Sequence, residues 1–592
     1  MVSRRILILV AGCVAALLAT IPGLVSGYWQ FIIASVAFSS IAVLAVSMLA
    51  GLTGIWSLGH MAFVALGAYL ALNLSGLGLP LELIVPVAFV VSGLIGFLLG
   101  LSAGRFSVLY FGLLTLALGL TSTEIIGHWT AVTGGDEGLP VPPAWLLVAN
   151  MTIGLRGAVV VTICLAVISF LVADAVERSP TGSKWRAIKS QRTASAAIGL
   201  RAQMENAKAF ALSAAIASLA GIGIAFSIGY LDPVGFDLGA GIRLIVATVV
   251  GGAGSLLGSV VGAAFITVVP EFARNLPSMT SFIFGIATVL TLLFLRQGIV
   301  PSLAGLMKRR PAATAATPDV MTRESVTQLV QELLPRATSA LVVDDVSVRF
   351  GGLRALDSVS LTLPAGASIG LIGPNGAGKT TLLNVLSGFY VASSGNVRIG
   401  DVELTGLPAS SRAGVGFGRT FQHAELFAEL TLRRMLEMTA LLGAPRRKAA
   451  GLSPLDPANV AARILSGLGI LAHADRLPAE LPFGVQKVAD VARVMATGAS
   501  IIALDEPFAG LDSDERRTIR TILQGMRRGG VSILIIDHAV QEVMDVSDQA
   551  VALEFGRVVA RGMPEEVRRH PEVLRAYFGS STVMAEPEEA QS

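Results

Sequence analysis

Long hydrophobic runs fill the first half of this chain, whereas the second half alternates short apolar segments with charged and glycine-rich ones. Up to residue 306 the apolar runs reach about twenty residues, the length that an α-helix needs to cross a bilayer. Charged residues are concentrated after residue 308. The pattern predicts an α-helical polytopic membrane domain followed by a water-soluble domain.

The apolar runs are candidate membrane helices, and basic loops orient them. Lysine and arginine crowd residues 178–208 and 308–310, which favours a cytoplasmic position for both segments. Because many further apolar runs follow the first, a retained helix is favoured over a cleaved signal peptide. The candidate helices are 6–25, 28–50, 59–74, 82–101, 106–126, 156–176, 207–229, 242–269 and 281–295.

Parity constrains how many of these runs cross. If the first six cross from a cytoplasmic N-terminus, the chain reaches the basic loop on the cytoplasmic side. Three runs remain, yet only an even number of crossings returns the second half to the cytoplasm. The run 242–269 is the one expected not to span, because the glycine-rich segment 251–255 divides it into two pieces too short to cross. Such broken helices line protein cavities in transporters.

A second glycine-rich segment, 51–60, is another candidate break. If so, Trp56, Ser57 and His60 become candidates for a substrate path, although close helix packing explains the glycines equally well. For His60 the simpler interpretation is a hydrogen-bonded packing residue. Glu124, near the end of its apolar run, is either functional or close to interfacial water. The acidic segment 133–138 is expected in an external loop, where it meets a partner or solvent.

Composition excludes several classes of function. The 44 Lys and Arg residues nearly balance 41 Asp and Glu residues, so the chain shows no sign of nucleic-acid binding. Cys13 and Cys164 are the two cysteines, and both lie in apolar runs without disulfide or metal-site spacing.

A phosphate-binding loop follows the strand-like segment 368–372 and opens into a helix-like segment that starts at Thr381. Glycines there let backbone N–H groups approach phosphates, while a lysine neutralises phosphate charge and a hydroxyl ligates Mg²⁺. We therefore assign ATP binding to Gly373, Pro374, Asn375, Gly376, Ala377, Gly378, Lys379, Thr380 and Thr381, with Thr380 also on Mg²⁺.

Polar residues at two further strand ends complete the predicted catalytic site. Asp505 is expected in the Mg²⁺ shell, and the adjacent Glu506 is expected to polarise the attacking water. His538 follows a second buried-strand pattern, within possible reach of a γ-phosphate. Gln422 lies on a loop from which its amide could sense Mg²⁺ or water. Phe350 either stacks on adenine or belongs to a strand core.

These motifs, in this order, resemble the ATPase of ATP-binding cassette (ABC) transporters from residue 341 to about residue 579. The resemblance implies an α/β P-loop NTPase domain, and a mechanism in which two ATPases sandwich two nucleotides. Each P-loop is then completed by the signature of the other ATPase. The signature here, 481–485, keeps Leu481 and Gly484 but loses the family's serine and glutamine. With Gln486 it is similar to the variant of branched-chain amino acid importers, in which Val485 is unusual.

The membrane half resembles the permease of the same importers at 54–60, 133–135 and 251–258. The resemblance implies that residues 185–200, named here the coupling segment, dock on the ATPase; a basic loop held by anionic lipid is the alternative. It also implies a second permease and a second ATPase, as a homodimer or heterodimer, and a periplasmic substrate-binding protein. We expect domains at 1–307 (permease), 308–340 (linker) and 341–579 (ATPase), and a disordered tail at 580–592.

Together these features predict ATP-driven uptake of branched-chain or related small amino acids across a bacterial inner membrane, with the ATPase in the cytoplasm. Importers of urea, amides or aromatic acids remain alternatives, as do an exporter and a non-transporting nucleotide sensor. The sequence leaves the substrate open, because we expect an apolar, glycine-lined cavity without a distinctive charged ligand.

Overall fold

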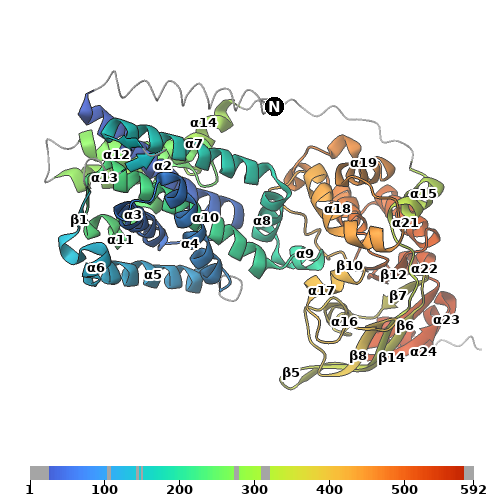
Figure 1. Ribbon diagram of the computed structural model, residues 1–592. Coiled ribbons are helices and arrows are strands. Elements are labelled where there is room, and N and C mark those ends of the chain that lie inside the picture. Colours follow the sequence, from blue (N-terminus) through green and yellow to red (C-terminus); the bar gives the residue numbers. More distant parts are fainter. Residues whose placement is uncertain are drawn as a thin grey trace, which may run out of the picture. The chain divides into compact units, whose positions relative to one another are not determined.

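The computed structural model describes residues 26–102, 108–141, 146–148, 151–272, 279–307 and 321–578 (Figure 1). Internal contacts divide the protein into two compact units. The first comprises residues 1–185 with 202–313, and the second comprises residues 186–201 with 314–592. The coupling segment, apart from Trp185, therefore belongs to the second unit. The predicted helix 6–25 and the predicted tail 580–592 lie outside the described residues.

The first unit is a bundle of apolar helices. In the described part of the chain, six helices are long and apolar enough to cross a membrane. Residues of α2 and α10 are mostly buried at the centre of the bundle, whereas α4, α5 and α13 expose apolar side chains. The helices are α2 (Gly27–Thr53), α3 (His60–Gly76), α4 (Leu81–Gly100), α5 (Val108–His128), α7 (Leu155–Arg178), α10 (Ala202–Ser227), α11 (Leu238–Gly251), α12 (Leu256–Phe272), α13 (Thr280–Phe294) and α14 (Ile299–Met307).

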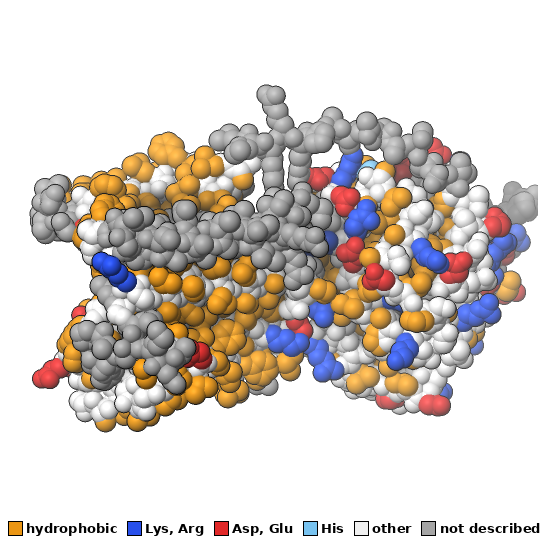
Figure 2. All heavy atoms as spheres, turned by 45° about the horizontal axis from the view of Figure 1, so that its top comes forward, with side chains coloured by type: hydrophobic (Ala, Val, Ile, Leu, Met, Phe, Trp, Pro, Cys, Tyr) orange, Lys and Arg blue, Asp and Glu red, His pale blue; other side chains and the backbone are white. Residues whose placement is uncertain are grey.

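Figure 2 shows the consequence at the surface, where hydrophobic side chains cover the helices of the first unit and charged side chains gather on the second. Exposed side chains such as Leu94 and Leu98, each 60% accessible, are stable in this position only against lipid or protein. The protein is accordingly a multi-pass membrane protein.

The run 242–269 folds as a hairpin of two helices. A Cβ on Gly251 would clash with the Gly258 carbonyl oxygen, and one on Gly262 with that of Ala247. From the pair Gly251 and Gly258 to the pair Ala247 and Gly262, the residue number falls in α11 and rises in α12. The two helices are therefore antiparallel. The run was expected to consist of two pieces too short to cross, and the structure has two short helices between which the chain reverses. That the two helices meet inside the membrane stays a prediction. A hairpin returns the chain to the side from which it came, so the predicted parity is preserved.

The two glycine-rich breaks lie against each other. Residues 54–59 interrupt the helical structure between α2 and α3, and 252–255 form the turn between α11 and α12. A Cβ on Gly51 would lie 2.2 Å from the Gly254 Cα, and the Gly254 N–H donates to Ser47 Oγ at 3.0 Å. Tyr28 Oη donates to Glu271 at 2.5 Å, so the end of α12 lies beside the start of α2. Only glycine allows the backbones to approach this closely.

Two loops on the external side of the expected topology are joined by a short sheet. Strand β1 (Leu139–Pro140) pairs antiparallel with β4 (Tyr230–Leu231). In a separate two-stranded sheet, β2 (Leu146–Val148) pairs antiparallel with β3 (Met151–Ile153). The loop before β1 also contains α6 (Thr130–Thr133) and η1 (Gly135–Glu137), and β4 leads through η2 (Pro233–Phe236) into α11. This pairing places the segments before α7 and after α10 on the same face.

The second unit is built on two sheets. The larger has the order β10-β11-β12-β7-β13-β14; all neighbours are parallel except β13 and β14. Its strands are β7 (Ser368–Ile372), β10 (Phe417–Arg419), β11 (Ile501–Asp505), β12 (Ser532–Ile536), β13 (Gln549–Glu554) and β14 (Arg557–Gly562). The smaller, antiparallel sheet contains β5 (Leu341–Phe350), β6 (Leu353–Leu363), β8 (Ser394–Ile399) and β9 (Val402–Glu403). Strands β7, β11 and β12 are wholly buried, as continuous apolar strands of a parallel sheet should be.

Helices cover the sheets and form a separate helical lobe. The lobe consists of α18 (Leu432–Ala449), α19 (Pro457–Gly467) and α20 (Phe483–Ala496), which pack on one another. Around the sheets lie α16 (Lys379–Leu386), α17 (Ala409–Gly414), α21 (Ser513–Arg528), α22 (Val540–Val546), α23 (Pro564–Arg568) and α24 (Pro571–Phe578). Part of the expected linker 308–340 is the helix α15 (Arg323–Leu333), which packs on α21 through Val326 and Val330. The coupling segment forms α9 (Arg192–Ala197) and the end of α8 (Pro180–Ser190).

Candidate functional site

The phosphate-binding loop lies between β7 and α16, as its sequence context predicts. Gly376 and Gly378 have φ of 81° and 102°, a region that other residues rarely adopt. A Cβ on Gly378 would also lie 2.7 Å from the Ala355 carbonyl oxygen. The loop therefore turns tightly enough to direct backbone N–H groups and the start of α16 toward a bound phosphate.

Lys379 is the cation of this loop. Its Nζ donates to the carbonyl oxygens of Gly373 at 2.5 Å and Pro374 at 2.9 Å, so the ammonium group lies over the loop. Burial lowers the pKa of Lys379, and the carboxylates of Glu506 and Asp505 partly oppose this effect. Thr380, the next residue, is exposed at the start of α16, and Thr381 follows in the same turn.

Sheet order brings the predicted catalytic residues together. Strand β12 lies between β11 and β7, and all three are parallel. Their carboxyl ends therefore meet at one edge, where Asp505, His538 and the phosphate-binding loop follow the three strands.

Glu506 is held between two of the other predicted catalytic residues. Gln422 Nε2 donates to Glu506 Oε2 at 2.9 Å, and His538 Nε2 lies 3.0 Å from Glu506 Oε1. Glu506 has a φ of 49°, an uncommon backbone conformation for a non-glycine residue. Its N–H donates to the Ile536 carbonyl oxygen at 2.7 Å, which ties this strained turn to β12. The arrangement fixes a carboxylate at the edge that carries the phosphate loop.

Asp505 is paired with an arginine that sequence reasoning did not single out. Arg419 Nη2 lies 3.1 Å from Asp505 Oδ2, and both side chains are almost completely buried. Burial raises the pKa of Asp505, and the Arg419 charge and hydrogen bond oppose that rise. Arg419 also donates to Asn384 at 2.6 Å, so it links β10, β11 and α16.

Lys487 is the second residue that sequence reasoning missed. It lies on α20 and is buried, and its Nζ donates to the carbonyl oxygens of Gln422 at 2.7 Å and Glu506 at 2.9 Å. It thus joins the two catalytic loops through their backbones. Its position directly after Gln486 was a weak signal, because nothing local shows that this lysine turns inward.

The signature residues begin the helix α20. Gly484 lies in its first turn, where a Cβ would lie 2.1 Å from Glu515 Oε1. Phe483 beside it is 46% exposed. A Cβ on Gly510 would lie 3.0 Å from the Phe483 ring, so this ring packs on Gly510. The start of α20 therefore has an exposed aromatic face next to the turn that precedes α21.

Phe350 is not a strand-core residue, because its side chain is 47% exposed at the end of β5. Its ring packs edge to face against Tyr390, with centroids 5.3 Å apart. The exposed aromatic pair leaves a ring face available for a base, so adenine stacking stays a prediction.

The coupling segment contacts the loop that follows Gln422. Lys189 Nζ lies 2.6 Å from Glu429 Oε1, and the Ala194 N–H donates to the Glu425 carboxylate. Because Ala194 lies in the first turn of α9, this carboxylate also faces the positive end of the helix. Burial raises the pKa of Glu425. The segment is thus attached to the same loop that carries a catalytic residue.

In the first unit, His60 has the contacts of a packing residue. Its Nε2 lies 2.6 Å from Ser213 Oγ, which donates to the Ala45 carbonyl oxygen, and its ring contacts Phe63 and Phe210. Glu124 is exposed near the end of α5 and lies 3.8 Å from His128.

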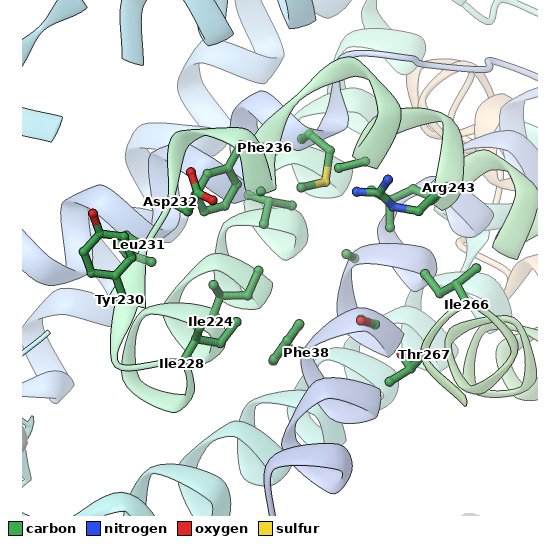
Figure 3. A pocket seen from close by; sticks show the side chains of 17 residues that line it. Phe38, Ile224, Ile228, Tyr230, Leu231, Asp232, Phe236, Arg243, Ile266 and Thr267 are labelled. Atoms are coloured by element: carbon green, nitrogen blue, oxygen red, sulfur yellow. The ribbon is translucent and has the colours of Figure 1, made fainter. Parts of the chain in front are cut away.

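A pocket of about 310 Å³ opens among α2, α3, α10, α11 and α12 (Figure 3). Trp56, Ser57 and His60 do not line it. The expectation of a cavity without a charged side chain is wrong for this pocket, because Asp232 and Arg243 line it. Arg243 had a sequence signal, since it is the second residue of the predicted apolar run 242–269 and an ionisable residue in such a run is a default candidate for function.

Comparisons with known proteins agree with this division of the chain. Residues 28–292 match the family model described as branched-chain amino acid transport system / permease component, and residues 356–509 match the ABC transporter model. The chain is 38% identical over 253 residues to the high-affinity branched-chain amino acid transport ATP-binding protein LivG of Escherichia coli K12. It is 36% identical over 250 residues to the corresponding protein BraF of Pseudomonas aeruginosa. It is 32% identical over 245 residues to the lipopolysaccharide export system ATP-binding protein LptB of Escherichia coli K12. Each match covers 41% of this chain and 98% of the relative.

Proposed function

This chain belongs to the branched-chain amino acid family of ABC transporters, with permease and ATP-binding subunit in one polypeptide, and we propose that it imports branched-chain or related small amino acids across a bacterial inner membrane. Its ATPase half binds ATP and couples hydrolysis to transport. The similarity to LptB means that the ATPase sequence alone leaves the direction of transport open. The match of the membrane half to the permease component of a branched-chain amino acid transport system supports uptake.

The observation that carries the proposal is the position of Glu506 between Gln422 and His538. A carboxylate in this place can accept a proton from the water that attacks the γ-phosphate. His538 and Gln422 hold the carboxylate at a fixed angle, and Lys379 supplies positive charge for the phosphate oxygens. These residues support hydrolysis, and a nucleotide sensor without turnover needs no such base.

We assign the metal of the nucleotide to the oxygen atoms of Thr380, Asp505 and Gln422. Hydroxyl, carboxylate and amide oxygens are a donor set that suits Mg²⁺. The amide nitrogen of Gln422 donates to Glu506, which leaves its oxygen for a ligand role. A Mg²⁺ ion held by these residues would supply positive charge for the phosphates.

The active transporter contains a second permease and a second ATPase, as another copy of this chain or as different subunits. The start of α20, with the exposed Phe483 beside the buried Gly484, is the surface that completes the nucleotide site of the partner ATPase. The loops joined by β1 and β4 face a periplasmic substrate-binding protein. We keep the domains at 1–307 and 341–579, with α15 of the linker packed on the ATPase.

Uptake into proteoliposomes tests the proposal. The transporter is reconstituted with its binding protein, and ATP inside the vesicles drives accumulation of radiolabelled L-leucine. Glu506→Gln should bind ATP normally but reduce hydrolysis and uptake at least ~100-fold, because the general base is lost. Glu565→Gln, a surface carboxylate on α23, is the matched control and should retain both activities. Export instead of uptake, or normal hydrolysis by Glu506→Gln, contradicts the proposal.

A further inference from the structure

We propose that the pocket of the first unit is a binding site for a zwitterionic α-amino acid with an aliphatic side chain, whose carboxylate pairs with Arg243 and whose ammonium pairs with Asp232. This inference rests on the proposed function for the choice of an aliphatic amino acid. The pairing of charges comes from the pocket itself.

The pocket combines an apolar wall with one charge of each sign. Phe38, Ile224 and Phe236 belong to the apolar lining, and Asp232 and Arg243 are its charged residues. Figure 3 shows that the charged side chains enter from different elements, Asp232 from the loop after β4 and Arg243 from α11. A volume of about 310 Å³ is near the lower end for ligand pockets, which suits a small molecule.

Neither charge is neutralised by the residues that the structure describes. No ion pair within 4.0 Å joins Asp232 or Arg243 to each other or to any other described side chain. Asp232 accepts a hydrogen bond from the Val234 N–H at 3.0 Å, which uses one carboxylate oxygen, Oδ1. The carboxylate of Asp237, the N-cap of α11, is the nearby opposite charge: a Cβ on Gly239 would lie 3.2 Å from it and 3.6 Å from Arg243 Nη1, yet the two side chains form no ion pair within 4.0 Å.

Arg243 and Asp232 are both exposed, so each charged group is accessible to a solute that enters the pocket. A free amino acid carries a carboxylate and an ammonium group a few bonds apart, so one molecule can pair with both residues. Its aliphatic side chain would then contact the apolar wall and lose its hydration. A purely apolar solute satisfies neither charge, and an amine or an acid satisfies one.

The site lies where an imported solute arrives. Residues of the external loop, Tyr230 to Phe236, form one side of the pocket, and α3, α10 and α11 continue it into the bundle. A solute released by a binding protein above β1 and β4 thus reaches this pocket before the deeper glycine contact of Gly51 with Gly254.

Direct binding to the complete transporter, purified without binding protein, tests the site. The probe is tritiated L-leucine, displaced by unlabelled L-leucine, 4-methylpentanoate, which lacks the ammonium, or isopentylamine, which lacks the carboxylate. The wild-type protein should bind L-leucine at least ~10-fold more tightly than either analogue, because each leaves one charged residue unpaired.

The two variants should change this preference in opposite ways. Arg243→Gln should weaken the binding of L-leucine at least ~10-fold and leave the binding of isopentylamine unchanged. Asp232→Asn should weaken the binding of L-leucine by the same factor and leave the binding of 4-methylpentanoate unchanged. Asn at position 232 keeps an oxygen that can accept the hydrogen bond of the Val234 N–H. Arg243→Lys should bind L-leucine more tightly than Arg243→Gln does, because lysine keeps the positive charge. Arg156→Gln and Asp136→Asn, external charges outside the pocket, are matched controls.

The outcomes separate this inference from the proposed function. If the reconstituted transporter accumulates L-leucine but both variants bind it as tightly as wild type, the pocket assignment is overturned and the importer stands. A loss of all three ligands in both variants, with normal basal ATPase, also overturns the charge pairing. If L-leucine is not transported but another amino acid binds with the same dependence on both residues, the site stands and the proposed substrate is wrong.

Discussion

At the scale of single residues, Lys487 connects the two catalytic loops. Its Nζ is buried and donates to the backbones that carry Gln422 and Glu506. Replacing it with methionine keeps most of the volume but leaves two carbonyl oxygens without their donor, at about 1–3 kcal/mol each.

We expect Lys487→Met to lower the kcat of ATP hydrolysis at least ~10-fold while the KM for ATP changes by less than about threefold, since 1.4 kcal/mol corresponds to a factor of ten. Steady-state hydrolysis by the purified protein measures both constants. Lys448→Met, an exposed lysine of α18, is the control. A normal kcat in Lys487→Met would show that Lys487 does not position these loops.

Glu425 gives a pH dependence with a defined sign. Burial raises its pKa in the folded protein above the ordinary value of about 4.3, so the folded state holds the proton more tightly than the unfolded state. Stability must therefore fall as the pH rises from the ordinary pKa through the raised one, and the cost is fully present above it.

Glu425→Gln removes this cost. Its Tm should exceed that of the wild-type protein at pH 7.5. The difference should shrink at pH 4, where the Glu425 carboxyl of the wild-type protein is mostly protonated in both the folded and the unfolded state. Thermal unfolding of the full chain at the two pH values measures the difference, with Glu565→Gln as the surface control. An equal difference at both pH values would rule out the titration of Glu425 as its cause.

The residue scale also shows where sequence reasoning stops. Asp505, Glu506 and His538 were predictable because each follows a buried strand, and parallel strands bring their carboxyl ends to one edge. Arg419 and Lys487 were not, since their roles depend on contacts with residues 86 and 65 positions away. Local pattern does not reveal such partners.

At the scale of elements, the ion pair of Lys189 with Glu429 attaches the coupling segment to the loop that follows Gln422. Lys189 and Glu429 are both partly exposed, so their ion pair should add little to stability, about 0–1 kcal/mol. The ion pair would instead serve to orient the coupling segment on the loop that begins at Gln422, because Glu429 lies on that loop.

Charge reversal tests this interpretation. Lys189→Glu should leave basal hydrolysis intact but lower its stimulation by substrate-loaded binding protein several-fold, because like charges then repel across the contact. The double variant Lys189→Glu with Glu429→Lys should restore at least half of the stimulation. Stimulated ATPase activity in proteoliposomes measures this, and failure of the double variant to recover would contradict a direct pairing.

The membrane elements were predictable in extent but not in arrangement. The predicted run 28–50 corresponds to α2 and the predicted run 82–101 to α4, because apolar length is a local property. The glycines of 251–255 indicated a break, yet only packing shows that the chain reverses there. Gly251 and Gly262 allow α11 and α12 to approach, and that contact selects the hairpin.

At the scale of the whole molecule, the hairpin predicts that both of its ends face the same side. In a background with Cys13 and Cys164 replaced by alanine, Val234→Cys and Phe272→Cys should both react with an impermeant maleimide added outside cells. Their side chains are 67% and 85% exposed. Arg178→Cys, before the coupling segment, should react only after the membrane is permeabilised. Labelling of Val234→Cys and Phe272→Cys from opposite sides would contradict the hairpin.

The sequence by itself determined the division into an apolar helical half and a nucleotide-binding half, the phosphate loop and the strand-end carboxylates. These features depend on periodicity, length and short motifs, which act over a few residues. Only the tertiary structure decided that the chain reverses at Gly252 to Ser255, that Lys487 supports Glu506, and that Asp232 and Arg243 share an apolar pocket. The physical reason is that burial and charge pairing join residues far apart in the chain, and their energies depend on which surfaces pack together.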